Sequence, residues 1–229
     1  MVAFGYDCKC NDYKLFAAGS TSSRKMLFDM YSVALNSWKS IEEVPYGFPE
    51  GFKSGVLVNG NFHWLADRPE DCSGFLVSLD ISNEIFKEME LPIENLEDDL
   101  YFYEVGVLEG CLGLLEDLYD DHVRLWVMQN YGVGDSWTVR YTFKDHRILN
   151  RDVRLTWSFK SGEILLGGVG TYGLLVCDPK YGRNREPNVS RSRLYQQELY
   201  FESLVSLKSS TYVDGKEEIE EPNKKKTRN

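Results

Sequence analysis

The chain has 229 residues, enough for one large domain or two ordinary ones, and its 14 Tyr, 12 Phe, 5 Trp and 19 Gly favour many short strands joined by tight turns. A formal net charge of -10 would repel a phosphate backbone, so we expect no nucleic-acid partner. No apolar run approaches the roughly 18 residues of a membrane span, and the start lacks a signal-peptide pattern. We therefore expect no membrane partner and a location in the cytoplasm, the nucleus or both.

Taken in chain order, the sequence shows a series of similar units of short predicted strands. The first unit has an apolar strand at 30–35 and a shorter strand at 36–39. Each later unit begins with a two-residue turn that favours Gly at a positive φ, followed by two apolar runs. The first of these runs are at 62–67, 111–117 and 163–168, and the second are at 75–80, 123–128 and 173–178. A further strand is predicted at 83–89 and at 135–140.

Two landmarks repeat at nearly the same period. The opening turns are separated by 50 and 52 residues and contain Gly60, Gly110 and Gly162. The last strands carry aromatic residues separated by 48 and 51 residues, namely Trp38, Phe86 and Trp137. A period near 50, with three or four strands and a recurring aromatic residue, is typical of propeller blades. We therefore predict an all-β fold: a kelch-like β-propeller with about four blades in this chain, forming a partial or incomplete ring.

The sequence contains three histidines, and His63 lies between two aromatic residues on a predicted strand. Side chains alternate along a strand, so Phe62 and Trp64 should share one face while His63 and Leu65 share the other. The equivalent positions in the two later units hold no histidine. We therefore expect His63 to lie between blades with its nitrogens hydrogen-bonded, rather than to act as a base or a metal ligand.

Other motifs that suggest chemistry have simpler interpretations. The segment 168–173 has the G-x-G-x-x-G spacing of a dinucleotide site, but a strand rather than a helix follows it, which predicts a hairpin connection. The cluster 116–122 holds five ionisable groups but lacks the Gly and distal Glu of an EF-hand loop, so we expect a solvated turn. The histidines fall in separate stretches and no G-x-S-x-G elbow occurs.

The five cysteines are odd in number and scattered, without a Cys-x-x-Cys pair, and we interpret them as reduced thiols. From these observations we expect no enzymatic activity, no cofactor and no metal site. A propeller enzyme remains an alternative, which metal analysis of the purified protein would test.

Five phrases occur in an order and spacing that closely resemble one plant family. They are Phe4-Gly-Tyr-Asp7, Asn11-Asp-Tyr-Lys14, Val58-Asn-Gly-Asn-Phe-His-Trp-Leu-Ala66, Leu79-Asp-Ile-Ser-Asn-Glu-Ile-Phe86 and Glu202-Ser-Leu-Val-Ser-Leu207. Together they resemble the plant F-box associated domain (type 1), the C-terminal interaction module of F-box and F-box/kelch-repeat proteins. The resemblance implies a substrate-recognition module of an SCF-type E3 ubiquitin ligase complex, which recruits a target protein for ubiquitination.

The resemblance also sets expectations for partners and boundaries. The family holds its target with this domain and binds a Skp1-like adaptor through an N-terminal F-box. No F-box precedes Met1 here, so we expect adaptor binding only if an upstream F-box exists. The alternative is a free-standing protein-binding propeller that lost its F-box and does not engage the ligase. We expect the propeller domain to cover 1–207, with 202–207 as a ring-closing strand, and a disordered charged tail at 208–229.

Propellers usually bind partners through the loops between their strands, and several loops here carry suitable side chains. The segment 181–193 is the basic stretch within the domain and could contact an acidic or phosphorylated partner through its guanidinium groups. A solvated loop that balances an acidic protein is the plainer interpretation. Our candidate partner-binding residues are Tyr119, Asp120, Asp121, Tyr131, Arg183, Arg185, Arg191 and Arg193.

Overall fold

A computed structural model describes ten segments of the chain, which together contain the strands discussed below. These segments are 2–20, 26–41, 44–48, 55–68, 70, 73–92, 101–118, 122–144, 153–168 and 174–187. Within them the chain forms sixteen β-strands and one 3-10 turn, η1 (Gly134–Ser136), and no helix long and apolar enough to cross a membrane.

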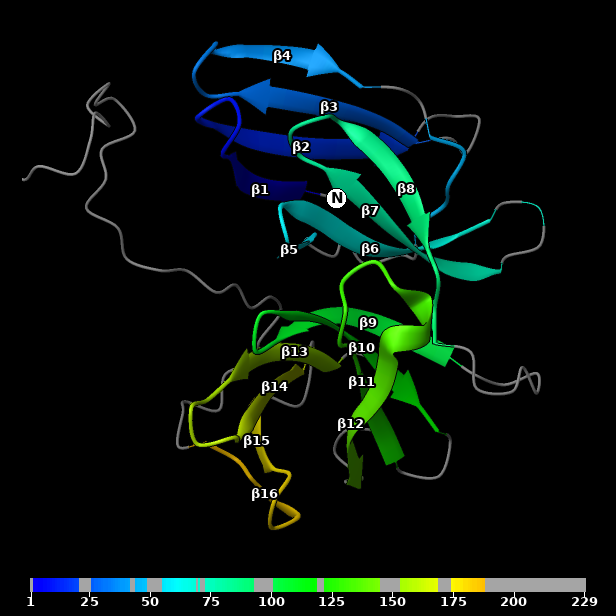
Figure 1. The fold of residues 1–229 in the computed structure, drawn as a ribbon, viewed down its shortest axis with the longest axis vertical. Helices are drawn as coiled ribbons and strands as arrows, with labels where there is room; N and C mark the ends of the chain where they lie inside the picture. The colour runs from blue at the N-terminus through cyan, green and yellow to red at the C-terminus, as the bar shows by residue number, and fades with distance from the viewer. Residues whose placement is uncertain are drawn as a thin grey trace, which may run out of the picture. The chain divides into compact units, whose positions relative to one another are not determined.

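The described strands form four antiparallel sheets of four strands each, coloured in succession from blue to orange in Figure 1. Blade 1 contains β1 (Val2–Asp7), β2 (Asp12–Ser20), β3 (Met26–Ser32) and β4 (Ser37–Ser40). Blade 2 contains β5 (Val56–Val58), β6 (Asn61–Asp67), β7 (Gly74–Asp80) and β8 (Ile85–Met89). Blade 3 contains β9 (Tyr101–Leu108), β10 (Cys111–Asp117), β11 (His122–Met128) and β12 (Trp137–Lys144). Blade 4 contains β13 (Val153–Ser158), β14 (Ile164–Gly168), β15 (Leu174–Asp178) and β16 (Arg183–Arg185).

Each sheet is a simple meander in which the spatial order of the strands follows their order in the chain. Such sheets, arranged one after another, are the blades of a four-bladed β-propeller. The prediction of an all-β propeller with about four blades is therefore confirmed. The predicted closing strand at 202–207 and the tail at 208–229 lie outside the described residues.

The turn glycines adopt the conformation that the repeat predicted. Both residues of Asn59-Gly60 and of Glu109-Gly110 have positive φ, the combination required by a type I′ hairpin turn. Gly162 also has a positive φ, but its hairpin is longer than expected. The amide of Phe159 donates to the carbonyl of Glu163, which leaves a three-residue loop that ends in a left-handed glycine. The prediction of a two-residue turn was wrong for this copy.

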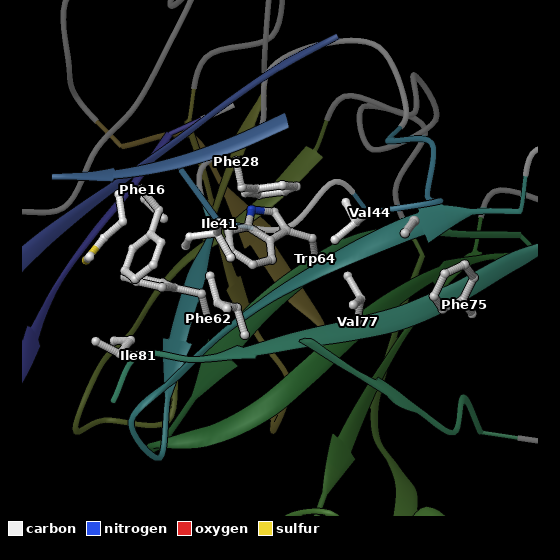
Figure 2. Packing of buried hydrophobic residues seen from close by; sticks show 13 residues of the cluster. Phe16, Phe28, Ile41, Val44, Phe62, Trp64, Phe75, Val77 and Ile81 are labelled. Atoms are coloured by element: carbon white, nitrogen blue, oxygen red, sulfur yellow. The ribbon is translucent and has the colours of Figure 1, made fainter. Parts of the chain in front are cut away.

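Three buried layers of apolar side chains join successive blades. The first layer lies between blades 1 and 2 and is rich in aromatic residues, including Phe16, Phe28, Phe62 and Trp64 (Figure 2). A second layer combines side chains of blades 2 and 3, and a third combines blades 3 and 4. Each inner blade therefore has two covered faces, one toward each neighbour.

The aromatic landmarks occupy the fourth strand of three blades but differ in burial. Trp38, Phe86 and Trp137 lie in β4, β8 and β12. Phe86 packs against the layer between blades 1 and 2, and Trp137 is buried in the layer between blades 2 and 3. Trp38 is 57% exposed. In blades 2 and 3, this face of the sheet is therefore covered by the preceding blade. The corresponding face of blade 1 is exposed.

Two glycines in first strands allow neighbouring blades to approach. A Cβ on Gly5 would lie 2.7 Å from a ring carbon of Phe62, and one on Gly106 would lie 2.7 Å from the Cβ of Leu155. Real side chains do not tolerate such distances. The alternation within Phe4-Gly-Tyr-Asp7 follows from this packing, because Gly5 and Asp7 face blade 2 while Phe4 and Tyr6 are exposed.

Several strand predictions need correction. The strand predicted at 30–35 is β3, which begins earlier and ends at Ser32, because a hairpin turn follows directly. The strand predicted at 135–140 starts with η1 and continues to Lys144. The segment 168–173 does connect two antiparallel strands, β14 and β15, as a hairpin, although its residues 169–173 lie outside the description.

Candidate partner-binding surfaces

Tyr131, a predicted partner-binding residue, lies in the turn that follows β11 and contacts blade 2. Its hydroxyl accepts a hydrogen bond from Asn61 Nδ2 at 2.9 Å and lies 2.9 Å from His63 Nε2. Its ring meets the histidine ring edge-on, with the centroids 5.6 Å apart. The side chain is half-buried, so part of it is committed to the junction between blades 2 and 3.

The same contacts define the state of His63, which is fully buried. Its Nδ1 lies 3.1 Å from the carbonyl oxygen of Val56, which can only accept, so Nδ1 carries the proton. Nε2 then accepts from the hydroxyl of Tyr131. Burial lowers the pKa of His63 to about 4, against the opposing effect of the backbone contacts at Val56 and Asn61. The prediction of a hydrogen-bonded histidine between blades is confirmed.

Arg183 and Arg185 lie together on the edge strand β16 of blade 4, and both are exposed. The guanidinium of Arg185 donates a hydrogen bond to Glu163 at 2.9 Å. This bond is the main cause that lowers the pKa of the Glu163 carboxyl, and a hydrogen bond from Ser161 lowers it further. Between the two arginines, Asn184 donates to the carbonyl of Lys144 in blade 3. The structure therefore brings these two cations together on one strand, whereas Tyr131 belongs to a turn of blade 3.

The other predicted partner-binding residues lie outside the described part of the chain. They are Tyr119, Asp120, Asp121, Arg191 and Arg193. Their role, like that of the three residues above, stays a prediction.

Glu116, the first residue of the acidic segment 116–122, is not part of the solvated turn that we predicted, whereas residues 119–121 lie outside the described residues. Glu116 belongs to β10 and is fully buried. Its carboxylate accepts from the indole of Trp126 at 2.6 Å and forms an ion pair with Arg124 at 2.8 Å. Both partners lie on the neighbouring strand β11, so cross-strand pairing explains why a glutamate is accommodated there. Among the described residues, no group of three His, Cys, Asp or Glu could hold a metal ion.

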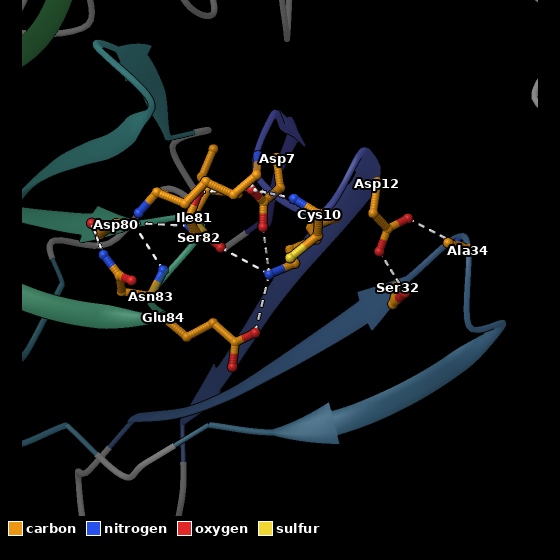
Figure 3. Close-up of polar contacts among 12 residues, drawn as sticks. Asp7, Cys10, Asp12, Ser32, Ala34, Asp80, Ile81, Ser82, Asn83 and Glu84 are labelled. Carbon is orange, nitrogen blue, oxygen red and sulfur yellow. Dashed lines mark hydrogen bonds and ion pairs between the residues drawn. The ribbon is translucent and has the colours of Figure 1, made fainter. Parts of the chain in front are cut away.

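A buried ionic cluster joins blade 1 to blade 2 (Figure 3). Lys14 lies 3.0 Å from Asp7 and 3.1 Å from Glu84, and it donates to the carbonyl of Ile81 at 3.0 Å. Ser82 donates to the other oxygen of Asp7 at 2.7 Å. Burial alone would raise the pKa of Asp7, but the hydrogen bonds from Ser82 and Lys14 outweigh it and hold that pKa well below its ordinary value of 3.8.

The lysine of this cluster is held in its charged form. Burial would lower the pKa of Lys14, but its hydrogen bonds to Asp7 and Glu84 outweigh this effect and raise it. Lys39 approaches Glu84 from the exposed side at 2.5 Å. Asp7 and Lys14 belong to the two N-terminal sequence phrases. Their contacts give them a structural role, which is to join blade 1 to blade 2.

The exposed face of blade 1 is an aromatic surface that our residue predictions did not include. We call it the aromatic face and define it by its apolar side chains in β1 to β4: Val2, Phe4, Tyr6, Tyr13, Leu15, Leu27, Tyr31 and Trp38. One register row crosses all four strands, and it consists of Phe4, Leu15, Tyr31 and Trp38. The alternation in β1 indicates a strand that places Val2, Phe4 and Tyr6 on one face, but it cannot show which face is uncovered.

Rings on this face are held by contacts with one another and with the hairpin turns. Phe4 stacks on Tyr13 with the centroids 5.5 Å apart and the planes 5° apart. The hydroxyl of Tyr6 donates to Asn11 and that of Tyr31 to Asn36, in both cases five residues further along the chain. Both asparagines adopt positive φ in their turns. Each tyrosine is therefore fixed by the turn of its own hairpin.

Comparison with known families identifies one that matches most of the chain. The family model described as "F-box associated beta propeller domain" matches residues 1–185. The chain is 30% identical over 163 residues to "F-box protein CPR1" of Arabidopsis thaliana, a match that covers 60% of this chain and 39% of that protein. It is 29% identical over 138 residues to "F-box/kelch-repeat protein At3g23880" of the same plant, covering 59% of this chain and 37% of the relative. The chain thus spans about two fifths of the length of these relatives.

Among solved structures, one match is TolB from Acinetobacter baumannii. The TM-score is 0.46 with 12% sequence identity, over 80% of this chain and 42% of that one.

Proposed function

The chain belongs to the F-box associated β-propeller family, and from this premise we propose that it is the target-recognition part of an SCF-type ubiquitin ligase. The observation that carries the proposal is the family match over residues 1–185, which spans all four blades. The relatives are named as F-box proteins, and in such proteins a separate segment would bind the Skp1-like adaptor. This chain would then hold the protein to be ubiquitinated.

The arrangement of charged groups supports a binding module rather than an enzyme. Buried polar groupings in the described part of the chain include a salt-bridged junction around Lys14, a neutral histidine at His63 and the ion pair of Glu116. Each contacts strands or turns of the propeller itself. We therefore propose that the protein acts by holding a partner, in the cytoplasm or the nucleus, and catalyses no reaction of its own.

A paired capture experiment tests this division of labour. Residues 1–229 and a version extended by an F-box would each be immobilised and offered a Skp1-like adaptor and a plant extract in the presence of a proteasome inhibitor. We expect both proteins to retain the same set of extract proteins, as identified by mass spectrometry. Only the version with the F-box should retain the adaptor.

Two results would contradict the proposal. Retention of the adaptor by residues 1–229 alone would show that the propeller is the adaptor-binding part. Failure of both proteins to enrich any extract protein over a propeller of another family would remove the recognition role.

A further inference from the structure

We propose that the two hairpin turns of blade 4 form the surface that holds the target, and that the bound segment of the target is anionic, with carboxylate or phosphate groups next to an apolar side chain. The inference rests on the proposed function, because it names the contact surface and the chemistry of the partner. We call this surface the basic turn patch and define it by Phe159 and Lys160 in the first turn and Lys180 and Tyr181 in the second.

The two turns lie side by side at one end of the blade 4 sheet. The first turn joins β13 to β14 and the second joins β15 to β16, while β14 and β15 pair through Ile164 and Cys177 beside the turns. Arg185 of β16 reaches Glu163 at the base of the first turn, at 2.9 Å, and so ties the two hairpins together. Turns at the end of a sheet belong to neither of the faces on which blades pack, so the patch does not depend on which face of blade 4 is covered.

The distribution of charge over the turns distinguishes blade 4 from the other blades. In blades 1 to 3, the turns after the first and third strands hold three carboxylates and one cation, namely Glu84, Glu109, Asp135 and Lys9. The same turns of blade 4 hold Lys160 and Lys180 and a single carboxylate, Glu163. The chain as a whole has a net charge of -10, so an anionic segment is attracted to this end of blade 4 rather than to the turns of the other blades.

The carboxylates beside the patch are already hydrogen-bonded and leave its lysines without a counter-charge. Asp178 accepts from two backbone amides of its own turn, at 3.1 Å and 3.2 Å, and Glu163 accepts from Arg185. Lys160 and Lys180 are exposed and form no ion pair within the described part of the chain. A carboxylate or phosphate group supplied by another molecule would give each ammonium group a charge-assisted hydrogen bond.

An aromatic residue adjoins each lysine and supplies the apolar part of the contact. Phe159 is 38% exposed and Tyr181 is 63% exposed. The ammonium group of Lys180 lies 5.0 Å from the centroid of the Tyr181 ring, which holds it by a cation–π contact. Both turns have a fixed backbone, because Phe159 donates its amide to the carbonyl of Glu163 and Asp178 binds the amides of the second turn. A preformed surface of this kind loses little entropy on binding.

Fluorescence anisotropy with three labelled peptides provides the test. The peptides share one sequence and differ at two positions beside a leucine, which hold phosphoserine, glutamate or serine. We expect residues 1–229 to bind an anionic peptide and to bind the serine peptide at least about tenfold more weakly. Preference for phosphoserine would identify a phosphorylated target and equal binding of the two anionic peptides an acidic one, and either result supports the proposal. Lys180→Glu should weaken binding of the anionic peptides about tenfold or more, because it brings like charges together.

Lys87→Glu is the matched control, because it makes the same change of charge at an exposed lysine of β8 in blade 2. It should weaken peptide binding less than about twofold, since salt screens charges that lie more than a Debye length apart. Equal weakening by Lys87→Glu and Lys180→Glu would overturn the proposal, because the attraction would then come from the charge of the whole chain. Equal binding of all three peptides would overturn it too, and so would loss of peptide binding in the version extended by an F-box, where the added chain would cover the patch.

The capture experiment distinguishes failure of this inference from failure of the proposed function. If the F-box version retains the same extract proteins with Lys180→Glu as without it, the target binds elsewhere although the function stands. If the unaltered protein retains none, the function itself fails.

Discussion

The ion pairs of Glu84 allow a direct test of how burial determines the energetic value of a charge. Lys14 and Lys39 both contact this carboxylate, at 3.1 Å and 2.5 Å, but the side chain of Lys14 is 6% exposed and that of Lys39 is 64% exposed. Lys14 also neutralises Asp7, whose side chain has no exposure. Lys39 makes the shorter contact, but because it is exposed it should contribute less to the free energy of unfolding than Lys14.

Replacing Lys14 with Met keeps most of the apolar stem and removes the ammonium group. Asp7 would remain buried without its counter-charge, and removing one partner of a buried pair costs about 3 to 5 kcal/mol of unfolding free energy. Lys39→Met removes a partly solvated pair, for which the expected cost is about 1 kcal/mol or less. Urea unfolding of both variants at pH 7, with the m-value checked for constancy, measures the difference.

A second variant shows whether the cost arises from the unpaired carboxylate. Asp7→Asn retains an oxygen that can accept from the amides of Lys9 and Cys10, which Asp7 now holds. In the Lys14→Met background this change should restore part of the lost stability, because the uncompensated charge is gone. Equal costs for Lys14→Met and Lys39→Met, or no recovery in the double variant, would refute the reasoning from burial.

Three further predictions concern other buried groups and turns. The pKa of His63 falls from 6.5 to about 4 on folding, so the unfolded chain binds more protons than the folded chain between these pH values. About 2.5 kcal/mol of unfolding free energy should therefore be lost on going from pH 7 to 4.5. Urea unfolding of His63→Gln at both pH values should show a correspondingly smaller loss. Gly110→Ala should lower the free energy of unfolding by about 1 kcal/mol, because the φ of Gly110 is +81°. Gly19 has an ordinary φ and open space around it, so Gly19→Ala should be neutral or slightly stabilising. Thermal unfolding of both variants measures the difference. Glu116→Ala should cost about 3 kcal/mol in chemical unfolding, since the Trp126 indole loses its acceptor inside the protein; a cost below about 1 kcal/mol would contradict the buried pairing.

Much of the fold could be predicted because its signals are local. Positive φ at Gly60, Gly110 and Gly162 follows from turn chemistry within a few residues, and side-chain alternation placed Phe62 and His63 on opposite faces of β6. The period near 50 then related these local signals to one another. Backbone conformation and strand alternation depend on neighbouring residues, so the amino-acid sequence by itself determined the turns and the strands that follow them. The first strands of blades 2, 3 and 4, which precede these turns, were not predicted.

Only the tertiary structure decided which of two apolar faces is covered and which acidic group is buried. Trp38, Phe86 and Trp137 hold equivalent places in the repeat, yet Phe86 and Trp137 pack against the preceding blade while Trp38 stays exposed. The sequence pattern groups Glu116 with a polar turn, whereas its cross-strand partner Trp126 holds it inside blade 3. Alternation assigns a side chain to a face, but what covers that face comes from residues far away in the chain, and packing between sheets leaves no periodic pattern by which to find them.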